Sequence, residues 1–334
     1  MSAIPRLAAG ACIWLLSLLT LTLAQTKPPE PCHGADLTQV AGLAAAETAR
    51  ADDLVNGDGL LWRVEKPDLA PSYLFGTIHS SDDSALEIAR RAAAPIAEAK
   101  VVATELGGPF DSVEKANMTA AILASALDRD HDTFAGFIAS EQREQIEKLI
   151  EGLGYPAAFA HHLKLWFLAV LTALPVCETQ REALDLPEVD QLLAQTARDA
   201  GVKVVGLETA QEQLDALAAM RPEAAVALLA LAAREPALND DLYATMLRLY
   251  GESRPAEILP VSDAAGGLSA AEREAQDQFL QVLLVGRNTV MAGRIAPLVA
   301  AGGAFIAVGA LHLSGRDGLV ERLRADGYTV TKVW

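Results

Sequence analysis

The sequence predicts an α/β fold whose mixed central sheet is built from two matching units, with a large helical insertion between them. The first observation is a Gly-x-x-His phrase that occurs twice, at residues 76–79 (Gly-Thr-Ile-His) and 309–312 (Gly-Ala-Leu-His). Each copy follows a β-prone run and precedes a polar turn, an amphipathic helical stretch and another β-prone run. The second observation is the mostly helical pattern over residues 111–200. We therefore expect two units of strand, histidine, turn, helix and strand.

Six short runs rich in β-branched and aromatic residues are predicted strands. They cover residues 60–64, 72–78, 101–106, 202–207, 304–308 and 328–331, and the first two form a hairpin. Predicted helices include residues 36–50, residues 84–100 with a kink at Pro95, and residues 165–174. The last of these is strongly apolar but too short to span a bilayer, so we expect a core helix.

Length and composition indicate a globular protein with an acidic surface. The chain has 334 residues, 51% of them hydrophobic, and its formal net charge at pH 7 is −17. A chain of this length can bury a substantial core. Its negative charge disfavours nucleic acid and anionic membrane surfaces as partners, because both carry the same sign of charge.

The first 24 residues have the features of a signal peptide. Arg6 is their only charged side chain, and residues 7–24 are mostly apolar, with Ala24 ahead of a cut before Gln25. We therefore expect residues 25–334 to form a periplasmic or secreted protein. The runner-up is a membrane anchor, because the apolar run is as long as a minimal spanning helix. Contact with a membrane is expected only in that second case.

Two cysteines, Cys32 and Cys177, remain after the predicted signal is removed. Export exposes them to oxidising conditions, and an even number favours one disulfide between them. Such a bond would tie the N-terminal arm to the middle of the chain. The alternative is a pair of buried thiols.

Four polar residues are predicted at the carboxyl ends of strands, where ligands of open α/β sheets collect. They are His79, Glu105, Glu208 and His312. Two imidazoles with one or two carboxylates suit Zn, Mn, Co or Fe, and they also suit acid–base chemistry without a metal. Structural roles remain open, since Glu105 could cap a helix or pair with an arginine, and Glu208 could simply begin a helix.

Several segments taken together resemble the TraB/GumN family, in its bacterial GumN-like branch, which is related to the Tiki metalloproteases. The match runs in the family's order from about residue 32 to the C-terminus. It comprises residues 61–67 (LWRVEKP), 72–79 (SYLFGTIH), 206–209 (GLET) with Gln213, Arg287-Asn288 with Met291-Ala292, and 308–313 (VGALHL) with Gly318-Leu319.

The resemblance implies one TraB/GumN-like domain over residues 25–334, with a fold like that of erythromycin esterase and the haem-binding ChaN-like proteins. Tiki proteins are described as metal-dependent proteases that use paired Gly-x-x-His motifs and an acidic residue. These positions match His79, His312 and Glu105 here. Cys32 and Cys177 also lie where GumN-like members often carry cysteines.

The combined hypothesis is an exported metal-dependent hydrolase, most specifically a peptidase that acts on a peptide or protein. The metal would be Mn, Co or Zn, and it would acidify a water and polarise the scissile carbonyl. The assigned residues are His79, His312 and Glu105 as ligands, Glu105 or Glu208 as general base, and Arg287 or Asn288 as oxyanion donor. The alternative is a non-catalytic protein that binds a peptide or haem.

Overall fold

The protein is a mixed α/β structure in the computed structural model, which describes residues 32–40, 55–108, 110–267 and 269–334. The predicted α/β class with a mixed central sheet is confirmed. The predicted signal peptide lies outside the described residues, as does most of the predicted helix 36–50. The described start of that segment is a short 3-10 helix, η2 (Leu37–Gln39), which Asp36 caps.

Six strands form one mixed sheet in the order β4-β3-β5-β2-β1-β6. Their bounds are β1 Leu61–Glu65, β2 Ser72–Thr77, β3 Val101–Thr104, β4 Lys203–Gly206, β5 Ala304–Gly309 and β6 Thr329–Lys332. The neighbours β4, β3, β5 and β2 are parallel, whereas β1 runs antiparallel to β2 and to β6. The predicted hairpin is therefore present as β1 and β2, and all six strands overlap the predicted runs.

Helices occupy most of the remaining described chain. In order they are α2 Asp83–Arg90, α3 Ala93–Ala97, α4 Ser112–Ala126, α5 Ser140–Gly152, α6 Ala157–Ala160, α7 Leu165–Thr172, α8 Val176–Ala183, α9 Val189–Asp199, α10 Ala210–Ala218, α11 Pro222–Arg234, α12 Pro236–Gly251, α13 Ile258–Gly266, α14 Ala270–Leu280, α15 Arg287–Ala301 and α16 Leu319–Ala325. Short turns of 3-10 helix are η3 Pro255–Glu257 and η5 Ala310–His312, and η4 Gln281–Gly286 is π-helical.

The segment 84–100 differs from its prediction, because it forms two helices rather than one kinked helix. α2 ends at Arg90 and α3 begins at Ala93. Pro95 has no N–H to offer the carbonyl of Arg91, four residues earlier, and its ring crowds that carbonyl. The chain instead closes tighter bonds, from the backbone N of Arg91 to the carbonyl of Ile88 and from that of Ala92 to the carbonyl of Ala89. The break therefore precedes the proline.

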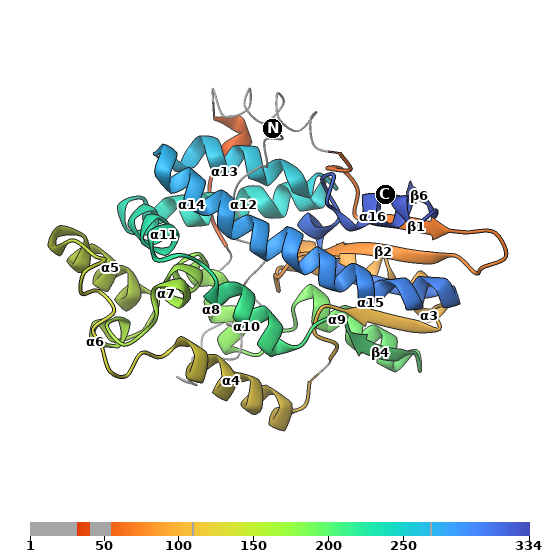
Figure 1. The fold of residues 1–334 in the computed structure, drawn as a ribbon, viewed down its shortest axis with the longest axis horizontal. Coiled ribbons are helices and arrows are strands. Elements are labelled where there is room, and N and C mark those ends of the chain that lie inside the picture. The colour runs from red at the N-terminus through yellow and green to blue at the C-terminus, as the bar shows by residue number, and fades with distance from the viewer. Residues whose placement is uncertain (1–31, 41–54, 109, 268) are drawn as a thin grey trace.

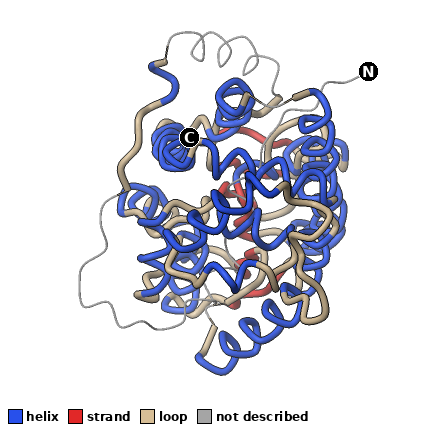
Figure 2. Tube along the Cα trace, turned by 90° about the vertical axis from the view of Figure 1, so that its left-hand side faces the viewer, coloured by secondary structure: helices blue, strands red, loops and turns tan. Residues whose placement is uncertain are grey.

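Helices cover both faces of the sheet. One face packs against α2, α3 and α9 through a core that includes Phe75, Val102, Phe305, Leu86, Ile96 and Leu193. The other face packs against α15 and α16 through Leu74, Ala103, Ile306, Met291, Ile295 and Leu323. Successive strand residues alternate between these two cores, as the two-residue period of a strand requires. Figures 1 and 2 show the strands enclosed between helices.

A third core lies beyond the carboxyl ends of the strands, in the helical half of the molecule (Figure 1). Helices α4 to α9 lie between β3 and β4 in the chain, where the helical insertion is predicted. This core takes side chains from α4, α5, α6 and α7, and also from α10, α11 and α14, which come later in the chain. The predicted core helix is present as α7, in which all eight residues are buried.

A continuous helical run crosses the front of the sheet in Figure 1 and ends as α15. Residues Glu272–Ala301, which are part of α14, η4 and α15, form the one described helix that is long and apolar enough to cross a membrane by length and composition. Its residues Met291, Ile295 and Val299 belong to the core of the sheet. Apolar side chains of this helix therefore pack against the sheet.

Cys32 and Cys177 form a disulfide, with Cα atoms 5.2 Å apart. The bond joins the arm that precedes the first strand to α8, across 145 residues of sequence. The predicted pairing is confirmed. In the chain-entropy model, a loop of this length stabilises the fold by about 5 kcal/mol through the unfolded state.

Candidate functional site

The four predicted strand-end residues meet at one edge of the sheet. Glu208, Glu105, His312 and His79 follow β4, β3, β5 and β2, the four parallel neighbours, in that spatial order. β2 and β5 pair directly, so that Gly76 lies beside Val308. Parallel neighbours end on the same side of a sheet, which explains why residues 233 positions apart in sequence converge.

The glycines of the two Gly-x-x-His motifs are needed for close contacts. A Cβ atom on Gly76 would lie 2.9 Å from the Cβ of Ala310, so a side chain there would collide with the second motif. A Cβ atom on Gly309 would lie 3.3 Å from Oε1 of Glu105 and 3.4 Å from the ring of His312. The glycines therefore bring the two motifs together and leave room for the carboxylate.

Arg287 binds both predicted carboxylates in a buried cluster. Its Nη2 atom donates to Oε2 of Glu105 at 2.5 Å and to Oε2 of Glu208 at 2.6 Å, and its Nε donates to Glu208 at 3.1 Å. Gln213 adds a 3.0 Å hydrogen bond to Oε2 of Glu105. The backbone N–H of Gly309 donates to Oε1 of Glu105 at 2.8 Å. Both oxygens of Glu105 are thus already hydrogen-bonded.

Nearby positive charge keeps Glu105 ionised despite burial. Burial by itself raises the pKa of Glu105, but the charges of Arg287 and His79 and the hydrogen bond from Gly309 outweigh it and hold the pKa well below its usual range. Burial by itself lowers the pKa of Arg287, but the charges of Glu105 and Glu208 outweigh burial and raise this pKa above its usual value. This buried pair is therefore charged on both sides, as complete hydrogen bonding allows.

His312 is held as a neutral imidazole by Asn288. Nδ2 of Asn288 donates to the carbonyls of His312 and Asp317, which leaves its Oδ1 to accept from Nδ1 of His312 at 2.8 Å. Nδ1 therefore carries the proton, and Nε2 carries a lone pair. Nε2 is buried without a hydrogen bond and lies 3.7 Å from Oε1 of Glu105.

The electrostatic surroundings favour the same neutral state of His312. The ring is fully buried, and burial, together with the charge of Arg287, lowers the pKa of His312 to about 3. Asn288 is neutral and does not oppose these effects. Nε2 is therefore an unprotonated, unpartnered nitrogen at neutral pH.

His79 lies in the opposite environment, among acids. Its Nδ1 is 3.4 Å from Oδ2 of Asp190 and 3.9 Å from Oε2 of Glu188. Burial lowers the pKa of His79, but Asp190 and the charges of Glu105 and Glu188 outweigh it and raise the pKa to about 9. Because 3.4 Å is long for a hydrogen bond, we attribute this rise mainly to charge. His79 therefore carries a proton at neutral pH.

The acids that face His79 are themselves buried and incompletely bonded. Oδ1 of Asp190 accepts from the hydroxyl of Thr77 at 3.1 Å, while its Oδ2 and both oxygens of Glu188 are buried without hydrogen bonds. Burial raises the pKa of Asp190, and it raises the pKa of Glu188 well above the usual value. The protonated ring of His79 therefore lies beside two buried carboxyl groups, those of Asp190 and Glu188.

The arrangement does not bring together three metal donors. Within the described residues, no group of three His, Cys, Asp or Glu side chains is placed to hold a metal ion. Nε2 of His312 suits a ligand, but the oxygens of Glu105 are hydrogen-bonded and His79 is protonated. A tightly bound divalent ion needs at least three protein ligands. The predicted metal stays a prediction, and we derive no step through it.

The sequence identified the residues at the sheet edge and missed those supplied by α9. Asp190 and Glu188 lie at the start of that helix, where acids are common for reasons of the helix dipole alone, so no local signal separates them. Arg287 and Asn288 begin α15 directly after the π-helical η4. The wider turn of a π-helix shifts the side-chain register, and such segments are frequent at functional sites.

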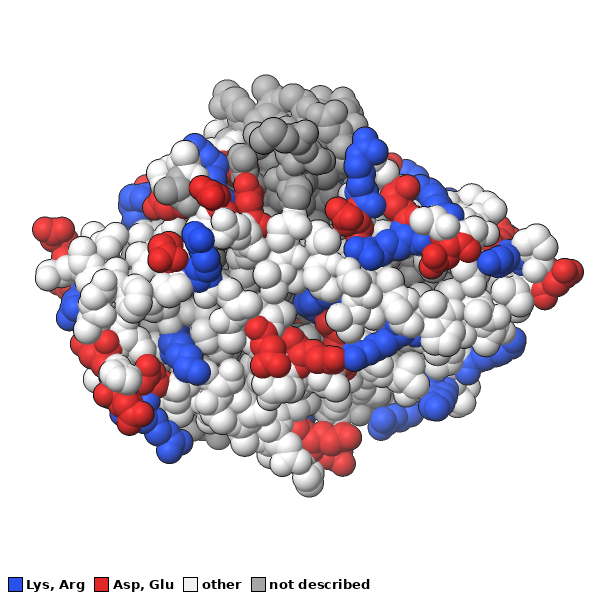
Figure 3. All heavy atoms as spheres, in the orientation of Figure 1, with Lys and Arg blue, Asp and Glu red and all other residues white. Residues whose placement is uncertain are grey.

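The two histidines of the site are buried beneath the molecular surface. In Figure 3, acidic and basic side chains meet near the centre of the face, over α10 and α15, next to a small recess. The ion pair between Arg294 and Glu212, at 2.6 Å, joins these two helices. His312 is 0% exposed and His79 is 2% exposed. The imidazoles are therefore enclosed, and the helical elements beyond the sheet edge form the cover.

A model of the TraB/PrgY/gumN family matches residues 60–332. The match includes both Gly-x-x-His motifs, both carboxylates and the Arg287-Asn288 pair. No curated protein and no solved structure matches the chain.

Proposed function

We propose that this chain, which belongs to the TraB/PrgY/gumN family, is an exported hydrolase that cleaves peptide bonds. The observation that supports this proposal most directly is that the two histidines have different hydrogen-bonding surroundings. Nδ1 of His312 is bound to an amide oxygen and its Nε2 is free, whereas Nδ1 of His79 faces two carboxyl groups. A site whose titratable groups are held in opposite states is suited to acid–base catalysis.

In this proposal His312 is the general base and His79 is the general acid. Nε2 of His312 takes a proton from a water molecule as the water oxygen bonds to the carbonyl carbon. His79 gives its proton to the amine as the C–N bond breaks, so the products are a carboxylic acid and an amine. Glu105, 3.7 Å from Nε2, stabilises the imidazolium that forms on His312.

The remaining predicted residues take supporting roles. Glu105 and Glu208 bind Nε and Nη2 of Arg287, and we assign Nη1 to the developing oxyanion. Asn288 uses its side chain to orient His312, so we assign it a positioning role. Because His312 is fully buried, a substrate reaches it only when the helical cover moves away from the sheet edge.

Two observations support export and the substrate class. The Cys32–Cys177 disulfide is typical of proteins from oxidising compartments. The choice of peptide substrates rests on the resemblance of the motifs to those of Tiki proteases. Periplasmic or secreted localisation would be checked by fractionation and by the N-terminal residue of the mature protein, which we expect to be Gln25.

The test is a peptide-library cleavage assay read by mass spectrometry, with the wild type, His312→Gln and His79→Gln. We expect cleavage by the wild type alone. Each assay is repeated with chelator and after loading with Mn, Co or Zn, because loss on chelation would restore the metal hypothesis. Cleavage by both variants would overturn the proposal, and binding of a peptide or haem without cleavage would favour the non-catalytic alternative.

A further inference from the structure

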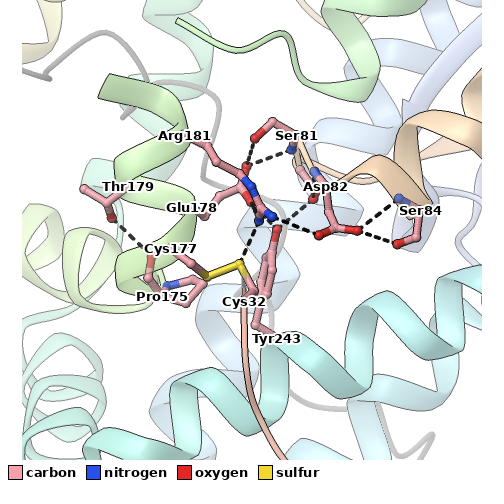
Figure 4. The surroundings of a disulfide bond; sticks show 11 residues. Cys32, Ser81, Asp82, Ser84, Pro175, Cys177, Glu178, Thr179, Arg181 and Tyr243 are labelled. Atoms are coloured by element: carbon pink, nitrogen blue, oxygen red, sulfur yellow. Dashed lines mark hydrogen bonds and ion pairs between the residues drawn. A yellow bond between two sulfur atoms is a disulfide. The ribbon is translucent and has the colours of Figure 1, made fainter. Parts of the chain in front are cut away.

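One buried carboxylate on α8 holds the loop that follows His79. Oε1 of Glu178 accepts hydrogen bonds from the backbone N of Ser81 at 2.7 Å and from the hydroxyl of Ser81 at 2.6 Å. The side chain of Glu178 is fully buried, at 0% exposure. Figure 4 shows it between α8 and this loop. The carboxylate thus replaces water as the partner of the loop backbone.

The second oxygen of Glu178 extends the same network. Oε2 accepts from the hydroxyl of Tyr243, on α12, and from Nη1 of Arg181 at 3.4 Å. The Tyr243 hydroxyl also lies 2.7 Å from Oγ of Ser80. Both residues that directly follow His79 are therefore bound to Glu178, one directly and one through a single hydroxyl.

The disulfide holds the helix that carries Glu178. Cys177 directly precedes Glu178 on α8, and its sulfur is bonded to that of Cys32. Nη1 of Arg181 donates to Sγ of Cys32 at 2.8 Å, and its Nη2 donates to Asp82 of the same loop at 3.1 Å. As Figure 4 shows, disulfide, arginine and loop form one connected group.

The loop also contacts the helix that supplies the acids facing His79. The carbonyl of Ser80 accepts from the backbone N of Val189 at 3.1 Å. Val189 lies between Glu188 and Asp190, whose carboxyl oxygens face the His79 ring. A shift of the loop would therefore displace His79 relative to its acids.

We propose that Glu178 is a positioning residue for His79, and that the Cys32–Cys177 disulfide keeps α8 in the place where Glu178 can act. This inference rests on the proposed function for its effect on turnover. A glutamine at position 178 cannot reproduce the network, because its amide nitrogen would face donors from Ser81 or from Tyr243 and Arg181. The loop should then move.

The test compares Glu178→Gln with Glu182→Gln, a substitution on the same helix. Glu182 is also buried, and burial beside Glu178 raises its pKa well above the usual value, so glutamine there replaces a neutral carboxyl group. For Glu178→Gln we expect kcat to fall about 10- to 100-fold with little change in KM. Glu182→Gln should keep the wild-type kcat.

A second readout does not depend on turnover. The His79 resonance in NMR spectra of histidine-labelled protein, assigned with His79→Gln, should shift in Glu178→Gln and stay in place in Glu182→Gln. A shifted resonance in a protein without any peptidase activity would support the positioning role and reject the proposed function. A folded Glu178→Gln protein with an unchanged resonance and kcat would overturn the inference.

Two further samples test the inference if Glu178→Gln does not fold, and test the role of the disulfide. If Glu178→Gln does not fold, Tyr243→Phe removes one donor to the same carboxylate, and we expect a smaller shift of the His79 resonance. Reduction of the wild type should also move this resonance. An unchanged resonance in folded Tyr243→Phe would overturn the role of Glu178, and an unchanged resonance after reduction would overturn that of the disulfide.

Discussion

His312 and His79 occupy matching positions after neighbouring parallel strands, yet their surroundings are opposite. His312 faces an amide oxygen and a nearby arginine, and the pKa of its imidazole is lowered to about 3. His79 faces Asp190 and Glu188, and its pKa is raised to about 9. The comparison teaches that a repeated motif determines where a side chain lies, while its tertiary neighbours determine its charge. The predictions below test this difference.

The largest expected effect is loss of turnover on removal of the base. His312→Gln removes the lone pair of Nε2 and should lower kcat about 1,000-fold, within the range that general acid–base groups contribute. The measurement is single-turnover cleavage of the best peptide from the library screen. His161→Gln is the control, because His161 is bonded to Asp132 and Glu147 away from the sheet edge. Equal losses in both variants would contradict the assignment.

The next effect concerns the pH dependence of stability, which should have opposite signs for the two histidines. The folded-state pKa of His79 is raised from 6.5 to about 9, so its stabilisation is complete below pH 6.5 and is lost as the pH rises through 9. That of His312 is lowered from 6.5 to about 3, so its contribution is complete above pH 6.5 and is lost as the pH falls through 3. These shifts amount to roughly 3 kcal/mol of unfolding free energy for His79 and roughly 5 kcal/mol for His312.

Urea unfolding between pH 3 and pH 10 measures both contributions. His79→Gln should flatten the alkaline limb of the stability curve, and His312→Gln should flatten the acidic limb. If both substitutions flattened the same limb, the two histidines would share one charge state and the comparison would fail.

A smaller effect is expected when His312 keeps its ring but loses its orientation. Asn288→Ala removes the acceptor from Nδ1 and should lower kcat about 10- to 100-fold, because the second partner of a functional histidine sets its tautomer and direction. Asn288→Asp keeps an acceptor and should recover part of the activity. Thr289→Ala, one residue further along α15, serves as the control for the helix. Wild-type turnover in Asn288→Ala would show that orientation by Asn288 is dispensable.

The smallest expected effect is a shift of the pH profile. Asp190→Asn removes a negative charge beside His79, so the pKa of His79 should fall and the alkaline limb of kcat/KM should move down by about one pH unit. The acidic limb, which reports His312, should stay in place. A profile that moves at both limbs, or at neither, would remove Asp190 as the cause of the charge on His79.

The sequence by itself determined the fold class, the six strands, the hairpin, the core helix α7 and the disulfide partners. These features depend on local periodicity and on residue type, which a single chain displays directly. It also placed His79, Glu105, Glu208 and His312 at strand ends, which parallel pairing brings to one edge. The glycines of the two motifs carried part of this signal, because a side chain at position 76 would collide with Ala310 and one at position 309 would crowd Glu105 and His312.

Only the tertiary structure decided what surrounds each residue at that edge. Asp190, Glu188 and Glu178 come from α8 and α9, about 100 residues after His79, and each resembles an ordinary helical acid in sequence. Asn288 reaches His312 across 24 residues, and Arg287 reaches Glu105 across 182 residues. Charge state depends on burial and on the nearest charges, and those neighbours are set by helix packing. Two motifs with the same Gly-x-x-His pattern could therefore acquire opposite protonation states.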